Sequence, residues 1–439
     1  MSNIDKLLKS DLKHVFHPCT QMKDFEKHPP LIVNKAEGSY LYTDRGPIID
    51  AISSWWCKSL GHGHPEITKA INTQLNQFEH VIVADTTYPN IVSLAEELEK
   101  VSGLQHTFFA SDGSSAVEIA LKLAIHASQL KGLPHRKEFI SLKNSYHGET
   151  LATLSISDLD TFKKPYQDFG LTCHFLQNIP YVTNMEDPLW HNCDEIWSKT
   201  LEELELFKES VCALIVEPIV QGANGMRIYS ADFLARLANW AKANDIYLIA
   251  DEIMTGFGRT GKWLASNHAN INPDLICISK GLTGGSLPLS CVLIDNEIYS
   301  LFYNDYNIDN SFLHSHTYSG NPLAVAAALA TIKTMQKENI IDKSEDLTLC
   351  MQEHFLNIAK LSGKISNVRF IGGIIAGDLE NHANKRIGYD LQQAAIKNGA
   401  LLRPIGRTLY WLPPLNTSHQ TIEKLAEITL KSIKDVYFS

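Results

Sequence analysis

The sequence predicts an α/β fold, with a large domain built on a mostly parallel sheet flanked by helices and a smaller α+β domain made from both chain ends. Between about residues 66 and 330, helical and strand-like segments alternate along the chain. Several apolar runs there are short, β-branched and non-alternating, as in strands that are buried on both faces. The two chain ends instead place short strands beside helices.

The elements of the large domain follow one another in a βα order. The periodicity predicts helices near 90–101, 115–131 and 231–244, and strands at 106–111, 138–142, 212–217, 246–251 and 274–279. The polar run at 185–194 predicts a connection within this domain, because periodicity resumes on both sides of it.

The smaller domain is expected from residues 1–65 and 332–439, which leaves 66–331 for the large domain. Its expected elements include short strands at 39–43 and 408–412 and a helix at 418–436. A chain of 439 residues suits a large core with one smaller domain appended.

Composition argues against several classes of protein. A formal net charge of -10 without any basic run argues against a nucleic-acid surface. The charged first residues do not resemble a signal peptide, and no run of about eighteen apolar residues occurs, so we expect a soluble cytoplasmic protein. The 8 cysteines show no Cys-x-x-Cys spacing, which favours reduced thiols and gives no indication of a metal.

Two strand ends carry the main functional signal. The apolar run 246–250 ends in Asp251, and the run 274–279 ends in Lys280. Ligands of open α/β sheets bind outside the carboxyl ends of the strands. An amine that bonds to an aldehyde and a carboxylate that keeps a proton on a pyridine nitrogen suit pyridoxal phosphate. The alternative is a helix-capping Asp and a solvated Lys.

A phosphate site is expected where a strand at 107–110 meets a helix that starts near 115. Gly113 allows close approach of the backbone, and Ser114 and Ser115 offer amide and hydroxyl donors where the helix dipole favours an anion. The alternative is an ordinary serine-rich helix cap. The segment 314–322 offers similar donors before another helix, as a weaker candidate.

Two further strand ends supply an aromatic ring and a carboxylate. Tyr146 follows the strand at 139–142 and could stack on a pyridine ring, although a tyrosine there can also simply pack on the core. Glu217 ends the strand at 213–216, and a buried carboxylate at that position requires a cationic partner.

Substrate contacts are expected from large and charged side chains in loops. Trp55 and Trp56 stand before a glycine-rich loop and could line a substrate channel. Arg403 follows an expected strand end and is shaped to hold a carboxylate through two hydrogen bonds, with a surface arginine as the alternative. His62 and His64 have no third ligand nearby, so a role in the loop is favoured over metal binding.

Three motifs in the middle of the chain resemble the class III, fold-type I pyridoxal-phosphate aminotransferases: 249–253, 256–261 and 279–281. Within that family, four further segments most resemble the branch that aminates 8-amino-7-oxononanoate in biotin biosynthesis: 17–22, 53–56, 219–223 and 403–406. The likeness spans nearly the whole chain.

The resemblance implies a catalytic Lys280 and a set of cofactor-binding residues: Gly113, Ser114, Tyr146, Asp251, Lys280, His316 and Thr317. In this set His316 and Thr317 are expected to reach the phosphate of the neighbouring subunit, which implies a homodimer with shared active sites. The implied substrate-binding residues are Cys19, Trp55, Trp56, Tyr146, Arg259, Lys280, Ser315 and Arg403.

The sequence departs from the family at three places and leaves alternatives open. Cys19 stands where the best-known members have a tyrosine that stacks on the adenine of S-adenosylmethionine, so lysine or another amine stays open as donor. Glu149 replaces an aspartate, and Ser315-His316 replaces a Gly-Pro. Other functions left open are an ω-amino-acid or diamine aminotransferase, an aminomutase, and a non-catalytic protein that keeps the fold. A gate in which Glu217 alternately pairs with Arg403 is a further hypothesis.

Overall fold

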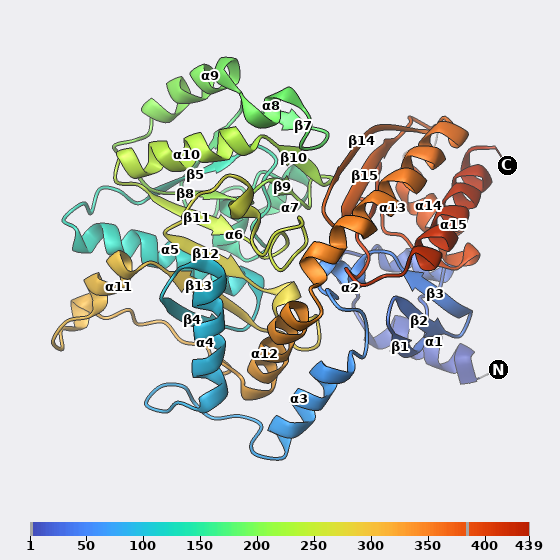
Figure 1. The fold of residues 1–439 in the computed structure, drawn as a ribbon, viewed down its shortest axis with the longest axis horizontal. Coiled ribbons are helices and arrows are strands. Elements are labelled where there is room, and N and C mark those ends of the chain that lie inside the picture. Colours follow the sequence, from blue (N-terminus) through green and yellow to red (C-terminus); the bar gives the residue numbers. More distant parts are fainter. Residues whose placement is uncertain (1–2, 383–385, 439) are drawn as a thin grey trace.

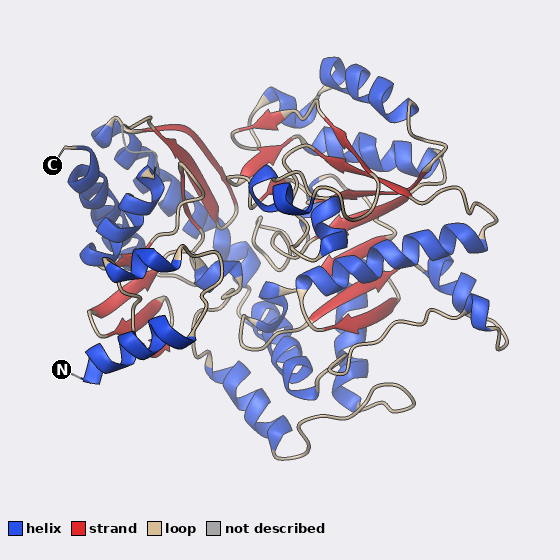
Figure 2. Cartoon of the chain, turned by 180° about the vertical axis from the view of Figure 1, so that it is seen from behind, coloured by secondary structure: helices blue, strands red, loops and turns tan. Residues whose placement is uncertain are grey.

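The computed structural model describes residues 3–382 and 386–438. The chain forms two lobes, and both chain ends lie in the same lobe (Figure 1). The larger lobe contains the central sheet, and the smaller lobe is formed by the first strands together with the last helices (Figure 2).

A seven-stranded sheet forms the centre of the larger lobe, in the order β4-β13-β12-β11-β8-β5-β6. Its strands are β4 (His106–Ala110), β5 (Glu138–Leu142), β6 (Cys173–Leu176), β8 (Val211–Val216), β11 (Tyr247–Asp251), β12 (Leu275–Ile278) and β13 (Ser290–Ile294). Neighbouring strands are parallel except around β13, which is antiparallel to both β12 and β4. The mostly parallel α/β fold expected from the sequence is confirmed.

Helices cover both faces of this sheet, because its strands are apolar on both faces. In β8, Ala213 and Ile215 join the core beneath one group of helices, whereas Leu214 and Val216 join the opposite core. Successive residues of a strand point to opposite faces. This explains why the apolar runs of the sequence do not alternate with polar residues.

The other elements of the larger lobe connect or flank these strands. The helices are α3 (Pro65–Leu75), α4 (Pro89–Ser102), α5 (Gly113–Leu130), α6 (Leu151–Ser155), α7 (Asp160–Lys163), α8 (Pro188–His191), α9 (Asp194–Glu205), α10 (Ala231–Ala243), α11 (Asn296–Phe302) and α12 (Pro322–Lys337). A small sheet joins β7 (Tyr181–Val182), β10 (Arg227–Tyr229) and β9 (Val220–Gln221). Single 3-10 turns are η2 (Lys164–Tyr166), η3 (Ala265–His268), η4 (Lys280–Thr283) and η5 (Ile308–Asn310).

The smaller lobe joins segments from opposite ends of the chain. Its strands form the sheets β1-β2-β3-β16 and β14-β15-β17: β1 (Val33–Glu37), β2 (Tyr40–Thr43), β3 (Gly46–Asp50), β14 (Ile365–Ile371), β15 (Ile374–Leu379), β16 (Ala400–Leu401) and β17 (Thr408–Trp411). Its helices are α1 (Asn3–His14), η1 (Met22–Glu26), the short turn α2 (Ser53–Trp56), α13 (Ile340–Ser362), α14 (Ile387–Asn398) and α15 (His419–Tyr437). On this topology we propose the division 1–65, 66–331 and 332–439.

The expected elements match the observed ones to within about two residues, and the main differences are omissions. The strands β6 and β13 were not expected, and the segment 185–194 contains the single helical turn α8. The 8 cysteines are free thiols, as expected. Over the described residues, the helices are too short or too polar to cross a membrane.

Candidate active site

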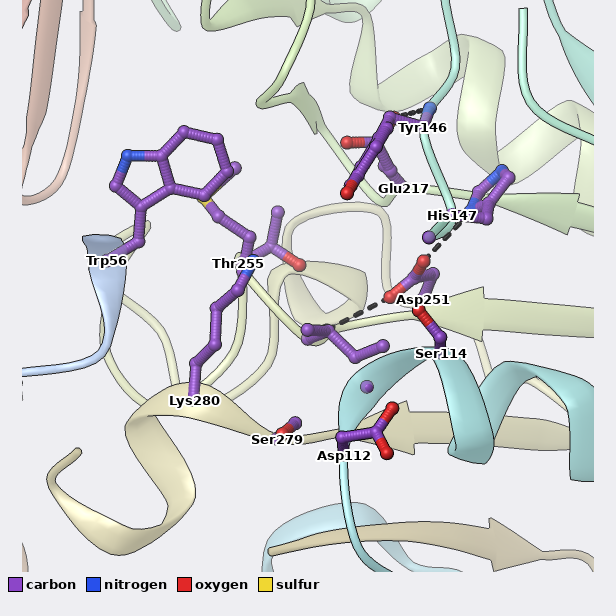
Figure 3. Close-up of a pocket in the computed structure, with 14 residues that line it drawn as sticks. Trp56, Asp112, Ser114, Tyr146, His147, Glu217, Asp251, Thr255, Ser279 and Lys280 are labelled. Carbon is purple, nitrogen blue, oxygen red and sulfur yellow. Dashed lines mark hydrogen bonds and ion pairs between the residues drawn. The ribbon is translucent and has the colours of Figure 1, made fainter. Parts of the chain in front are cut away.

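A cavity of about 240 Å³ opens at the carboxyl ends of β8, β11 and β12. The structure brings six of the residues expected at the site to its walls: Trp56, Gly113, Ser114, Tyr146, Asp251 and Lys280. Figure 3 shows Lys280 rising into this cavity with Trp56 on one side and Asp251 on the other. The two strand ends therefore face a single space.

Lys280 begins η4 two residues after the end of β12, with a positive φ of 44°. Burial lowers the pKa of its amine, while the nearby carboxylates of Asp251 and Glu217 act in the opposite direction. The Nζ atom lies 4.7 Å from the ring centroid of Trp56. The amine thus lies in an enclosed place where it gives up its proton more readily than in water.

Asp251 is held by a histidine that the sequence had not indicated. His147 Nδ1 lies 2.8 Å from Asp251 Oδ2, and both side chains are buried. Because a carboxylate only accepts hydrogen bonds, Nδ1 is the donor. His147 Nε2 lies 3.3 Å from Ser141 Oγ, and the amide of Ile253 donates to Asp251 Oδ1. This network fixes the orientation of the carboxylate in the cavity.

The start of α5 forms the opposite end of the cavity. The Asp112 carboxylate accepts from the amide and the hydroxyl of Ser115, at 3.0 and 2.7 Å. Ser115 is therefore used by the helix cap, which corrects the expectation that it serves a phosphate. Gly113 and Ser114 line the cavity. A Cβ at Gly148 would lie 2.3 Å from Ser114 Oγ, so that position needs glycine.

Glu217 lies in the same cavity as a buried carboxyl group. Its oxygens accept from the backbone amides of Tyr146 and Gly222, both at 2.9 Å. Burial raises the pKa of Glu217 to about 7, against the effect of the nearby His147. Within the described residues, Glu217 and Arg403 form no ion pair, so the hypothesised gate is not formed in this structure.

Tyr146 reaches the cavity from the loop after β5, and a residue outside this cavity, Glu149, binds its hydroxyl. Its hydroxyl donates to Glu149 Oε1 at 2.9 Å, and burial raises the pKa of this hydroxyl well above its usual range. The Tyr146 hydroxyl therefore stays protonated, and its hydrogen bond to Glu149 fixes the orientation of the ring.

A larger cavity of about 1170 Å³ adjoins the first and shares Trp56, Tyr146 and Lys280 with it. Its walls include Cys19, Trp55 and Arg403. The Arg403 guanidinium lies 4.3 Å from the ring centroid of Trp55 and donates to the Cys19 carbonyl oxygen at 3.4 Å. Burial raises the pKa of the Cys19 thiol.

Four expected site residues lie elsewhere. Arg259 is only 2% exposed and donates to the Pro413 carbonyl at 2.7 Å, while its Nη2 has no hydrogen-bond partner among the described residues. Burial lowers the pKa of this guanidinium to about 9. Ser315, His316 and Thr317 lie in the loop before α12, away from both cavities, where His316 Nε2 is 2.9 Å from His314 Nε2.

The histidine pair of the glycine-rich loop has a structural explanation. His62 Nε2 lies 2.8 Å from Asp50 Oδ2, and His64 Nε2 lies 3.8 Å from Glu338. Among the described residues, no group of three or more His, Cys, Asp or Glu side chains is arranged to hold a metal ion.

Comparison with known proteins gives one family. A family model described as Aminotransferase class-III matches residues 22–433. The adenosylmethionine-8-amino-7-oxononanoate aminotransferase of Helicobacter pylori is 37% identical over 96% of each chain. The protein of that name from Synechococcus elongatus is 39% identical over 91% of this chain and 94% of its own.

Solved structures agree with this result. The crystal structure of the Methanocaldococcus jannaschii adenosylmethionine-8-amino-7-oxononanoate aminotransferase superposes with a TM-score of 0.91 at 30% identity, covering 99% of this chain and 100% of that one. An amine transaminase from an uncultivated Pseudomonas species, solved with pyridoxal phosphate bound, gives a TM-score of 0.87 at 27% identity. That match covers 96% of this chain and 99% of the other.

Proposed function

Because this chain belongs to the class-III aminotransferase family, we propose that it transfers amino groups with pyridoxal phosphate held in the 240 Å³ cavity. The observation that carries the proposal is that Lys280 and Asp251 face this one cavity from neighbouring strand ends. Such a pair can attach to an aldehyde and protonate a pyridine nitrogen.

The residues present fit this cofactor. Gly113 and Ser114 offer backbone and hydroxyl donors at the start of an 18-residue helix, where the dipole favours a phosphate. Asp251, oriented by His147, would hold the ring nitrogen, and Tyr146 would lie against the ring. When bound, pyridoxal phosphate supplies an electron sink for the carbanion that forms as a proton leaves the amino-bearing carbon.

Lys280 is proposed as the group that moves this proton. A buried amine whose pKa lies below its usual value can serve first as base and then as acid. Trp56 and the surrounding loops shield the amine from water, and the Asp251 carboxyl group faces the same cavity. Because burial raises the pKa of Glu217 to about 7, this carboxyl group is proposed to take up or release a proton near neutral pH and so change the charge of the cavity.

The proposed amino acceptor is 8-amino-7-oxononanoate, which becomes 7,8-diaminononanoate in biotin biosynthesis. The names of the relatives from Helicobacter pylori and Synechococcus elongatus support this substrate. The larger cavity supports it as well, because it extends from Lys280 to Arg403 and so offers a guanidinium for a distant carboxylate.

S-adenosylmethionine is the proposed amino donor, on the same names. Cys19 lines the larger cavity where a stacking ring is expected, so this chain offers no aromatic side chain at that position. The donor assay below therefore includes lysine and simple ω-amines.

We further propose a homodimer in the cytoplasm, with active sites shared between subunits. The exposed Thr317 and its neighbours Ser315 and His316 lie away from both cavities of their own chain, which leaves them available to a neighbouring subunit. Free thiols at all 8 cysteines support a reducing compartment.

The function is tested by single-turnover spectroscopy of the purified holoenzyme. S-adenosylmethionine, lysine and ω-amines are added separately, and the visible absorbance of the bound cofactor is followed until it is lost. 8-Amino-7-oxononanoate is then added, and return of the absorbance supports the proposed acceptor. Return only with other aldehydes or keto acids would favour a general ω-aminotransferase.

Shared active sites are tested by mixing subunits. Lys280→Ala and Thr317→Asp are each expected to inactivate the enzyme, the second by placing a negative charge beside the phosphate. A mixed dimer would contain one site with both native residues, so mixing the variants should restore activity. Activity that stays absent after verified subunit exchange would contradict the shared site.

A further inference from the structure

Four consecutive residues with side chains form a left-handed helical turn beside the active site. The φ angles of Ser53, Ser54, Trp55 and Trp56 are 50°, 46°, 71° and 73°. The turn is closed by amides of Trp56 and Cys57, which donate to carbonyls four residues earlier. Because Cβ crowds the backbone in this conformation, the turn requires support from outside itself.

Asp50 supplies that support. Its Oδ1 accepts from the amides of Ile52 and Ser54 at 3.3 and 3.0 Å, and its Oδ2 accepts from the Ser54 hydroxyl at 2.7 Å. His62 Nε2 lies 2.8 Å from the same Oδ2. The carboxyl group is fully buried at 0% exposure, and all of these contacts converge on it.

The partners of Asp50 are themselves fixed. The backbone of His62 exchanges hydrogen bonds with Gly38 in both directions, at 2.8 and 2.9 Å. A Cβ at Gly61 would lie 2.8 Å from the Gly38 carbonyl oxygen, so glycine permits this close approach. Burial favours the neutral acid, but hydrogen bonds from His62 and Ser54 outweigh it and lower the pKa of Asp50. Asp50 is thus a charged anchor in a rigid setting.

The turn determines where both tryptophans lie. Trp56 donates from its indole to the Tyr410 hydroxyl at 3.0 Å and places its ring 4.7 Å from Lys280 Nζ. Trp55 places its ring 4.3 Å from the Arg403 guanidinium. At the start of the turn, Ser53 Oγ donates to the Leu412 carbonyl at 2.7 Å.

We infer that Asp50, supported by His62, is a positioning residue. It holds the Ser53–Trp56 turn in its left-handed form and so places Trp55 and Trp56 in the wall of the larger cavity, where substrate is proposed to bind. Asp50 lines neither cavity and acts only through the turn. This inference deepens the proposed function and rests on it for the choice of substrates. The structure of the turn can be tested without any substrate or cofactor.

The test compares Asp50→Asn with Asp378→Asn. Asp378 is a control carboxylate of the same lobe that accepts from Arg369 and Thr408, away from both tryptophans. Hydrogen exchange of the cofactor-free protein is measured for the amides of residues 54–57 and for β11. Asp50→Asn should speed exchange at 54–57 by about 10-fold or more and leave β11 unchanged. Asp378→Asn should change neither segment.

Steady-state kinetics of the holoenzyme supply the second readout. Asp50→Asn should raise KM for the acceptor about 10-fold and change kcat by less than about threefold, because the wall binds substrate while the proton is moved by Lys280. Adding Ser54→Gly to Asp50→Asn should restore both exchange protection and KM, since glycine adopts positive φ without a steric penalty. A general loss of stability would differ, because it would also speed exchange in β11.

Unchanged exchange at 54–57 in Asp50→Asn would overturn the inference, as would a KM equal to that of Asp378→Asn. Failure of Ser54→Gly to restore either quantity would also overturn it. If the native enzyme does not turn over 8-amino-7-oxononanoate, the proposed acceptor fails. The exchange data and KM for whichever carbonyl substrate restores the absorbance still decide the role of Asp50.

Discussion

The floor and the wall of the active site are built in different ways. The floor consists of Glu217, Asp251 and Lys280, which lie at or just after the ends of three neighbouring strands of one sheet. The wall consists of Cys19, Trp55, Trp56 and Arg403, which come from three separate segments of the chain. The residues proposed for chemistry thus lie at local strand ends, whereas those proposed for substrate binding meet through contacts between distant segments.

This contrast predicts different kinetic consequences. The floor is enclosed, with Asp251 only 5% exposed, so a substitution there changes charges in a place that water cannot screen. The wall is more open, since Trp55 is 41% exposed. Changes to the floor should therefore lower kcat, and changes to the wall should mainly raise KM.

The largest effect is expected at the floor from Lys280→Ala. Removal of the amine takes away both the attachment point and the proton carrier, so turnover should fall by about 10⁴-fold or more. Rapid-quench assays would measure the residual rate. Lys333→Ala, at an exposed position of α12, is the control and should keep native activity. Substantial turnover by Lys280→Ala would remove the basis for placing chemistry on the floor.

Asp251→Asn should have the next largest effect. The neutral amide cannot stabilise a protonated pyridine nitrogen, so kcat should drop by roughly 10²- to 10³-fold while KM changes little. Asp245→Asn is the matched control, because Asp245 pairs with Lys131 at the surface. Equal losses in the two variants would show that Asp251 is needed only for folding.

Arg403→Met tests the wall. Loss of a charged hydrogen bond to the carboxylate should raise KM for 8-amino-7-oxononanoate by about 10- to 100-fold, with kcat nearly unchanged. Arg407→Met serves as control, since Arg407 contacts Leu379 and Asn381 instead of the cavity. A fall in kcat without a change in KM would place Arg403 with the floor.

The smallest effect concerns pH and Glu217. Because its folded-state pKa is raised to about 7, the cofactor-free folded protein holds a proton that the unfolded chain releases from about pH 5 upward. Stability gained from this proton is present at low pH and lost as pH rises through 7. Relative to Glu217→Gln, native protein should lose up to about 3 kcal/mol between about pH 5 and 8.

Chemical unfolding at several pH values measures this difference. A constant penalty from the glutamine cancels, because only the slope with pH is compared. Parallel pH profiles for the two proteins would show that Glu217 is already ionised at low pH and that the floor tolerates another negative charge.

Sequence reasoning succeeded best on the floor. Asp251 and Lys280 could be found because buried parallel strands give short apolar runs whose ends lie at one sheet edge. Gly113 and Ser114 could be found because a helix begins there directly after a strand. In each case the signal lies within a few residues of the functional side chain.

The remaining features depend on contacts between distant positions. His147 meets Asp251 across 104 residues, and Asp50 finds His62 only because the loop folds back on Gly38. Nothing in the Trp55-Trp56 dipeptide itself indicates a left-handed turn. For Ser115 the sequence leaves a helix cap and an anion site open, because both have the same local pattern, and the Asp112 contacts show the cap.

The pairing of β3 with β16 has a consequence for synthesis of the protein on the ribosome. The strand β3 ends at Asp50, but its parallel partner Leu401 emerges only near the end of translation. The docking site of the turn, Leu412, emerges later still. All residues of the floor are therefore synthesised before the amino-terminal strand β3 can pair with β16. A product truncated before β16 would hold the lysine proposed as catalytic but would lack Arg403 and the Leu412 carbonyl that receives the turn.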